Sequence, residues 1–160
     1  MSGDKKGRTW WIPSFDMGIT FYNNGKRAGQ VNDIRIIANY TDSETKHSET
    51  IYFYPKWIVD YSSFQRLRSE RYKWLEESII RERFPITVKG NDESYLHVIL
   101  EADRWETKRK GEMSLTFQVH SSQHKKWKTC SDYMLSISEQ MFGWYAWTPF
   151  EKKLEQIRKL

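Results

Sequence analysis

The sequence is 160 residues long, with a hydrophobic content of 38%, an aromatic content of 16% and a formal net charge of +5. This length and aromatic content exclude a disordered chain, because each buried aromatic ring removes about 150–250 Å² from water and a chain of this size can form one core. The single cysteine, Cys130, excludes an internal disulfide and a zinc cluster of cysteines, and it is typical of a reducing compartment. The sequence has neither a long apolar run nor a secretory signal, so it predicts a cytoplasmic location.

The first third of the chain has the pattern of β-strands. Residues 1–9 are polar and basic, which predicts a disordered tail ahead of a single domain over residues 10–148. Apolar and polar residues alternate over residues 17–22 and again over residues 31–40, as in strands with one buried face. Asn24-Gly25 lies between them and favours a tight hairpin turn that joins the two strands in one core.

Two helices are predicted, one inside the domain and one after it. The first is an amphipathic insert over residues 62–83, where Ser62 and Gln65 have the spacing of a capping box and apolar residues then recur at helical spacing. It should end before Pro85, because the residue before a proline disfavours the helical conformation. The second is a short basic helix over residues 149–160.

Strand patterns return after the insert and define the fold class. Residues 86–88 and 95–100 are rich in β-branched and aromatic side chains, residues 113–119 alternate cleanly, and residues 127–137 supply a partner strand. Turn signals recur about every ten residues, as in sandwiches of short strands. The sequence therefore predicts a mainly β protein: an antiparallel β-sandwich of about seven or eight strands, with one inserted amphipathic helix and a short C-terminal helix.

Two segments resemble a known class of module. The run from Ile19 to Ile36 is similar to the opening two strands of immunoglobulin-like β-sandwich modules in uncharacterised bacterial proteins. Residues 85–90, with the strand over residues 95–100, resemble a later strand pair of the same modules. The resemblance covers about half of the chain and implies an immunoglobulin-like fold. Such modules are often attached to membrane anchors, which implies a role at a membrane surface, but a fold alone does not define an activity.

Motifs for catalysis and metal binding are missing. The chain has no Gly-x-Ser-x-Gly, and Cys130 has no glycine context, so no activated nucleophile is predicted. His120 and His124 are four residues apart, but the residues between them favour a turn, which removes the shared helix face that two metal ligands would need. The sequence predicts a protein that is not an enzyme and has no metal or cofactor.

Basic residues concentrate near the end of the domain. Between Arg104 and Lys128 seven cations face only two acidic residues, on two hairpin-type loops that each carry a tryptophan, Trp105 or Trp127. Aromatic rings on a basic surface are typical of single-stranded nucleic-acid binding, whereas cations at turns and edges also prevent strands from aggregating. The seven cations are Arg104, Lys108, Arg109, Lys110, Lys125, Lys126 and Lys128.

The most aromatic segment, residues 142–150, contains Trp144, Tyr145 and Trp147. If this segment is buried, it closes one end of the sandwich. If it is exposed, it is a docking patch for a partner protein or, with the basic helix after it, a membrane-surface anchor. The sequence thus favours a non-catalytic binding or assembly module with another protein as its partner. Single-stranded nucleic acid and a membrane surface are the alternatives.

Overall fold

The computed structural model describes residues 2–3, 9–62, 79–81 and 84–142. Within these residues the protein is mainly β and its paired strands are antiparallel, which confirms the predicted class. The elements in chain order are β1 (Ser2–Gly3), β2 (Thr9–Trp10), β3 (Ser14–Asn23), β4 (Gly29–Asp42), β5 (Ser48–Val59), β6 (Ile79–Arg81), β7 (Ile86–Val88), β8 (Asp92–Glu101), β9 (Gly111–Ser121), β10 (Lys128–Ile137) and the 3₁₀ turn η1 (Glu139–Met141).

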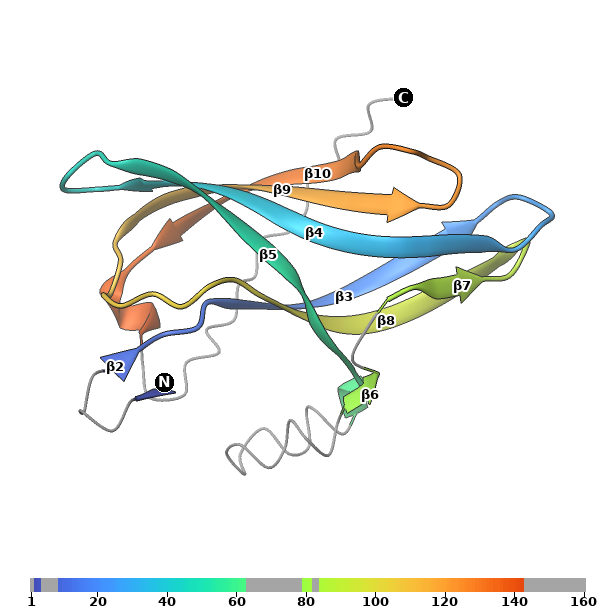
Figure 1. Ribbon diagram of the computed structural model, residues 1–160, viewed down its shortest axis with the longest axis horizontal. Helices are drawn as coiled ribbons and strands as arrows, with labels where there is room; N and C mark the ends of the chain where they lie inside the picture. Colours follow the sequence, from blue (N-terminus) through green and yellow to red (C-terminus); the bar gives the residue numbers. More distant parts are fainter. Residues whose placement is uncertain (1, 4–8, 63–78, 82–83, 143–160) are drawn as a thin grey trace.

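The main sheet is curled into two layers. Its strands follow the order β10-β9-β4-β5-β8-β3, and Figure 1 shows β4, β9 and β10 lying above β3 and β8. β5 belongs to both layers, because residues 48–53 pair with β4 and residues 54–59 pair with β8. The short strand β7 extends the first layer beside the start of β4, and β6 pairs with the end of β5.

The core lies between the layers and follows from the alternation of side chains along each strand. On β4, Ile34, Ile36 and Ala38 are buried against β9 and β8, while the residues between them face outward. Phe53 is buried at the point where β5 passes from one layer to the other. Each such large apolar side chain contributes about 1.5–3 kcal/mol on burial, so the two layers are held together mainly by this apolar contact.

The connection after β3 differs from the predicted hairpin. β3 pairs with β8, whereas β4 pairs with β5, β7 and β9, so residues 24–28 carry the chain from one layer to the other. The side-chain amide of Asn23 holds this connection by donating to the carbonyl oxygens of Arg27 at 2.9 Å and Val88 at 3.0 Å. The hairpin prediction is wrong because Asn24-Gly25 signals a local change of direction, and this signal does not determine which strands pair.

The predicted helices fall largely outside the described residues. Residues 63–78 and 82–83 of the predicted insert are not described, and Ile79–Arg81 is the strand β6, so the prediction of helix is wrong there. β-branched side chains at residues 79 and 80 favour a strand where the edge of β5 offers backbone partners. The C-terminal helix over residues 149–160 also lies outside the described residues. Within the predicted tail, Ser2–Gly3 pairs with Thr9–Trp10 in a small separate sheet.

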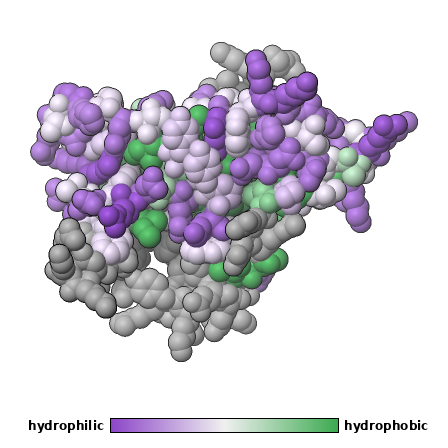
Figure 2. Space-filling model, viewed as in Figure 1, coloured by the Kyte–Doolittle hydropathy of each residue, from purple (hydrophilic) through white to green (hydrophobic). Residues whose placement is uncertain are grey.

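The surface of the described residues is mostly hydrophilic on the face shown in Figure 2. In the described part of the chain, no helix has the length and apolar character needed to cross a membrane.

Candidate functional site

The two basic loops lie at opposite ends of β9. Residues 102–110, the crossing loop, precede Gly111, and residues 122–127, the hairpin loop, follow Ser121 (Figure 1). β9 has 11 residues, and at about 3.4 Å per residue the loops are roughly 30–35 Å apart. The predicted basic surface is therefore two separate surfaces, and each has its own chemistry.

The crossing loop is a structural connection and not a hairpin. It joins β8, in one layer, to β9, in the other. Trp105 is only 7% exposed, and its backbone is bridged to Trp11 by hydrogen bonds of 2.7 and 2.9 Å. Its ring contacts the rings of Tyr40 and Phe142 at centroid distances of 6.4 and 5.9 Å. Trp105 is thus a core residue that closes one end of the sandwich, and its predicted role as a stacking ring for bases is wrong.

Both arginines of the crossing loop contact neighbouring side chains, Arg109 in a half-buried position and Arg104 in an exposed one. The guanidinium of Arg109 lies 4.4 Å from the ring centroid of Trp105 and forms an ion pair with Glu49. Burial lowers the pKa of Arg109, but an arginine remains charged at neutral pH. Arg104 lies 3.5 Å from a carboxylate oxygen of Glu106 and 5.3 Å from the ring centroid of Trp10. Lys108 and Lys110 are exposed.

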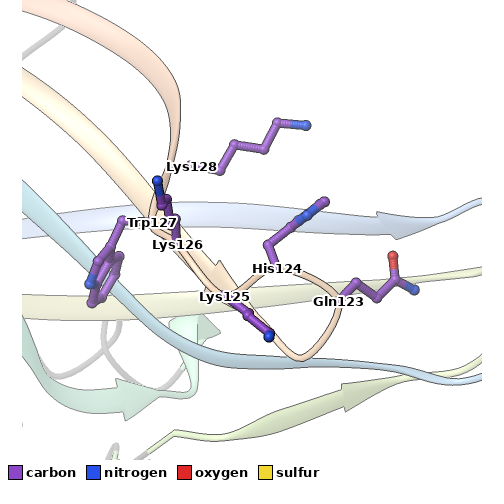
Figure 3. A pocket seen from close by; sticks show the side chains of 6 residues that line it. All are labelled: Gln123, His124, Lys125, Lys126, Trp127 and Lys128. Carbon is purple, nitrogen blue, oxygen red and sulfur yellow. The ribbon is translucent and has the colours of Figure 1, made fainter.

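The hairpin loop is open to solvent. β9 and β10 pair directly, so this loop stays within one layer. Lys125, Lys126 and Lys128 are exposed and Trp127 is half-buried, while residues 121–131 contain no acidic side chain. Residues 123–128 line a shallow pocket of about 420 Å³. Figure 3 shows the ring of Trp127 pointing to the side of the hairpin opposite Gln123 and His124.

Trp127 is held against the outer face of the sheet by Arg35. The guanidinium of Arg35 lies 4.1 Å from the ring centroid of Trp127 and 5.8 Å from that of Tyr52. Arg35 faces outward because its neighbours on β4 face the core, and its Nε donates to the side-chain oxygen of Gln118 at 2.8 Å. On the same face the ring of His120 lies 5.5 Å from that of Trp127.

Two exposed tyrosines extend this arrangement across the sheet. Tyr52 and Tyr54 are 44% and 47% exposed and flank the buried Phe53 on β5. Their ring centroids are 6.2 Å apart, with planes inclined by 11°. We call the set on this face the outer aromatic strip. It consists of Tyr54, Tyr52, Arg35, Trp127 and His120.

Sequence reasoning found Trp127 but missed the rest of the strip. The signal for Arg35 was present, because the alternation on residues 31–40 places it on the face opposite Ile34 and Ile36. The alternation of Tyr52 and Tyr54 around Phe53 was a second signal. Their approach to Trp127 depends on the pairing of β4 with both β5 and β9, which no local pattern encodes.

One acidic residue lies beside the strip. Burial raises the pKa of Asp33, although the backbone N–H of Ile34 at 2.8 Å and the nearby His120 and Arg35 lower it. Asp33 therefore opposes anion binding at this surface when it is ionised.

The single cysteine, Cys130, is not an activated nucleophile. Desolvation raises the pKa of its thiol, so the thiol is protonated at neutral pH and reacts poorly.

A histidine–carboxylate pair lies in the other layer. Nε2 of His97 contacts a carboxylate oxygen of Asp16, and the ring of Tyr61 lies 4.5 Å from the imidazole. His97 is buried, so this pair satisfies a polar side chain inside the protein. Among the described residues, no three histidine, cysteine or carboxylate side chains are grouped as metal ligands.

Trp144, Tyr145 and Trp147 lie outside the described residues. The predicted docking patch or membrane anchor that they form therefore stays a prediction.

Comparisons with known proteins do not identify a family. No family model and no curated protein matches the chain. Among solved structures the chain is similar to a family 123 glycoside hydrolase from Clostridium perfringens, whose structural analysis concerned glycolipid glycan hydrolysis. The TM-score is 0.39 at 8% identity, and the match covers 78% of this chain and 21% of that one. A likeness this weak supports no statement about fold or activity.

Proposed function

We propose that this protein is a non-catalytic binding module whose partner is negatively charged. Its contact surface is the outer aromatic strip together with the hairpin-loop lysines, by which we mean Lys125 and Lys126 of the loop and Lys128 at the start of β10. The observation that carries the proposal is the position of Arg35, which lies between Tyr52 and Trp127 on the outer face, next to a loop of exposed lysines.

The cations at this surface supply attraction of modest strength. Lys125, Lys126 and Lys128 are exposed, so each contributes about 1 kcal/mol toward an anion at 4 Å in water. These contributions are screened within about 10 Å at an ionic strength of 0.1 M. Binding should therefore weaken as salt is added.

The aromatic side chains supply a contact that charge alone does not. Tyrosine, tryptophan and arginine are enriched at the centres of protein interfaces, where a few residues provide most of the binding energy. The same side chains also stabilise a sheet by cross-strand packing, at about 0.2–1 kcal/mol for each pair. An experiment on function must therefore separate binding from stability.

The two loops provide a matched test. One double variant, Lys125→Glu/Lys126→Glu, changes the hairpin loop. The other, Lys108→Glu/Lys110→Glu, changes the crossing loop and alters the net charge by the same amount. The probes are heparin, poly-glutamate, a (dT)₁₅ oligonucleotide and vesicles with anionic lipids, each at 20 and 200 mM salt. We expect binding of at least one probe at low salt, with a larger loss in the hairpin-loop variant.

Two outcomes would overturn the proposal. The proposal fails if the unmodified protein binds none of these probes, or if the two double variants lose affinity equally. Poly-glutamate represents an acidic protein partner, and the vesicles test the membrane-surface alternative. The cytoplasmic location stays a prediction from the sequence.

A further inference from the structure

We infer that the outer aromatic strip binds single-stranded nucleic acid, with bases stacking on the tyrosines and phosphates contacting Arg35 and the hairpin-loop lysines. This inference rests on the proposed function and names the class of its partner.

The pattern of groups on the strip matches the chemistry of a nucleotide. Two aromatic rings, a guanidinium and a third ring follow one another, with separations of 6.2 Å from Tyr54 to Tyr52, 5.8 Å from Tyr52 to Arg35, and 4.1 Å from Arg35 to Trp127. Each nucleotide carries a flat base and an anionic phosphate, so it uses both kinds of group at once. A sulfated polysaccharide or an acidic peptide uses mainly the cations, and a neutral glycan uses mainly the rings.

The exposure of the rings indicates which side chains stack. Tyr52 and Tyr54 are the most exposed residues of the strip, at 44% and 47%. Trp127 is half-buried and has Arg35 close to its ring, so it supports the guanidinium and the adjacent loop. Base stacking should therefore depend chiefly on the tyrosines.

The shape of the surface favours a single strand over a duplex. The strip crosses the outer face from β5 through β4 and β9 to the start of β10, a path of about 14 Å at the usual strand spacing. A duplex keeps its base faces stacked within the helix, so rings that stand on a sheet cannot stack on them. A single strand exposes those faces, and stacking accepts any base. Binding should therefore be tolerant of sequence.

The position of the lysines gives the bound strand one continuous path. The hairpin loop adjoins Trp127 at one end of the strip, and the tyrosines lie at the other end. A strand laid along this path meets aromatic rings first and exposed cations last. The phosphate contacts make the affinity fall with added salt, and the ring contacts do not.

The test measures fluorescence anisotropy of labelled (dT)₁₅, with a 15-base-pair duplex and labelled heparin as comparison probes. The variants are Tyr52→Ala/Tyr54→Ala and Tyr52→Phe/Tyr54→Phe, and Tyr22→Ala removes a 71% exposed tyrosine from β3 as a matched control. Loss of the rings should weaken (dT)₁₅ binding at least about five-fold. The phenylalanine variant and Tyr22→Ala should bind as the unmodified protein does, and heparin affinity should be unchanged in all variants.

The outcomes distinguish this inference from the proposed function. If (dT)₁₅ and heparin bind equally well with or without the tyrosine rings, the nucleic-acid inference fails and the proposed anion-binding surface stands. If the duplex binds more tightly than (dT)₁₅, or only poly-glutamate or anionic vesicles bind, the inference also fails. If no probe binds at 20 mM salt, both fail. Thermal unfolding of each variant shows whether a loss of binding reflects a loss of fold. The phenylalanine variant keeps both rings, so it separates the effect of losing the rings from the effect of losing the hydroxyl groups.

Discussion

The two ends of β9 carry loops of similar composition that have different structural roles. Each loop has a tryptophan and cations, and an arginine guanidinium lies within about 4.5 Å of each tryptophan ring centroid: Arg109 of the crossing loop beside Trp105, and Arg35 of β4 beside Trp127. Trp105 is 7% exposed, whereas Trp127 is half-buried on the outer face. The crossing loop passes between layers, so its tryptophan enters the core. The hairpin loop stays within one layer, so its tryptophan lies outside. The route of the connection, and not its residue content, decides which tryptophan lies in the core and which lies on the outer face.

The tryptophans give the largest expected difference. Trp105→Ala should lower the free energy of unfolding by about 3–5 kcal/mol, because it leaves a cavity at the end of the core. Trp127→Ala should lower it by only about 0.5–1 kcal/mol, mainly through the lost contact with Arg35. Urea denaturation of both variants measures these values. Equal losses of unfolding free energy would contradict the placement of Trp105 in the core and of Trp127 on the outer face.

The arginines should follow the same order with smaller effects. Arg109→Ala removes an ion pair with Glu49 and a stacking contact with Trp105, and it should cost about 1–2 kcal/mol, between the values for exposed and buried pairs. Arg35→Ala should cost about 0.5–1 kcal/mol of stability while weakening (dT)₁₅ binding. Chemical denaturation and anisotropy, run in parallel, check both parts. A larger stability loss for Arg35→Ala than for Arg109→Ala would count against the comparison.

Asp42 lies beside the end of β9 that adjoins the crossing loop, and its contribution to stability should be lost at acid pH. The pKa of Asp42 is lowered to about 2 by hydrogen bonds from the backbone N–H groups of Thr45 and Glu44, with Tyr40 also donating to this carboxylate. A folded-state pKa below the ordinary value of 3.8 means that the carboxylate stabilises the fold above about pH 4. This contribution is lost as the pH falls through about 2.

Asp42→Asn tests this directly. The melting temperature should fall at neutral pH, and the difference from the unmodified protein should shrink between pH 4 and pH 2. Thermal unfolding followed by circular dichroism over this range measures the effect. A difference that is constant with pH would show that the charge of Asp42 is not involved.

The smallest effect is expected at Asp33, near the hairpin loop. Its pKa is raised by burial, so the folded state binds its proton more readily than the unfolded state. Ionised Asp33 therefore destabilises the fold at neutral pH, and the cost disappears as the pH falls through its raised pKa. Asp33→Asn should slightly raise the melting temperature at pH 7 but not at low pH. It should also tighten (dT)₁₅ binding about two-fold, and weaker binding would contradict the placement of Asp33 beside the strip.

The sequence predicted what depends on local pattern. Alternation over residues 31–40 and 113–119 corresponds to the buried and outward faces of β4 and β9, because side-chain direction in a strand has a period of two. Strand pairing across long stretches was not predictable in this way. For the same reason the expected hairpin at Asn24-Gly25 became a crossing between layers.

The candidate site shows the same limit. Trp127 and its lysines were found from composition, but Trp105 was grouped with them although it lies about a strand length away in the core. The alternation within each strand places Arg35 and Tyr52 on outward faces, but it does not show that these two faces adjoin. Their meeting depends on the pairing of Ile37 with Tyr52 and of Arg35 with Gln118, which brings residues from three strands onto one face.

The passage of β5 from one layer to the other has a consequence for folding. In the described part of the chain, β5 is hydrogen-bonded to β4 along its first half and to β8 along its second half. The pairing with β4 closes a short loop, whereas the pairing with β8 must close a much longer one, so the β4–β5 hairpin should form early and the second layer later. Amide hydrogens in the first half of β5 should then exchange more slowly than those in the second half, because opening of the second layer alone releases only the pairing with β8.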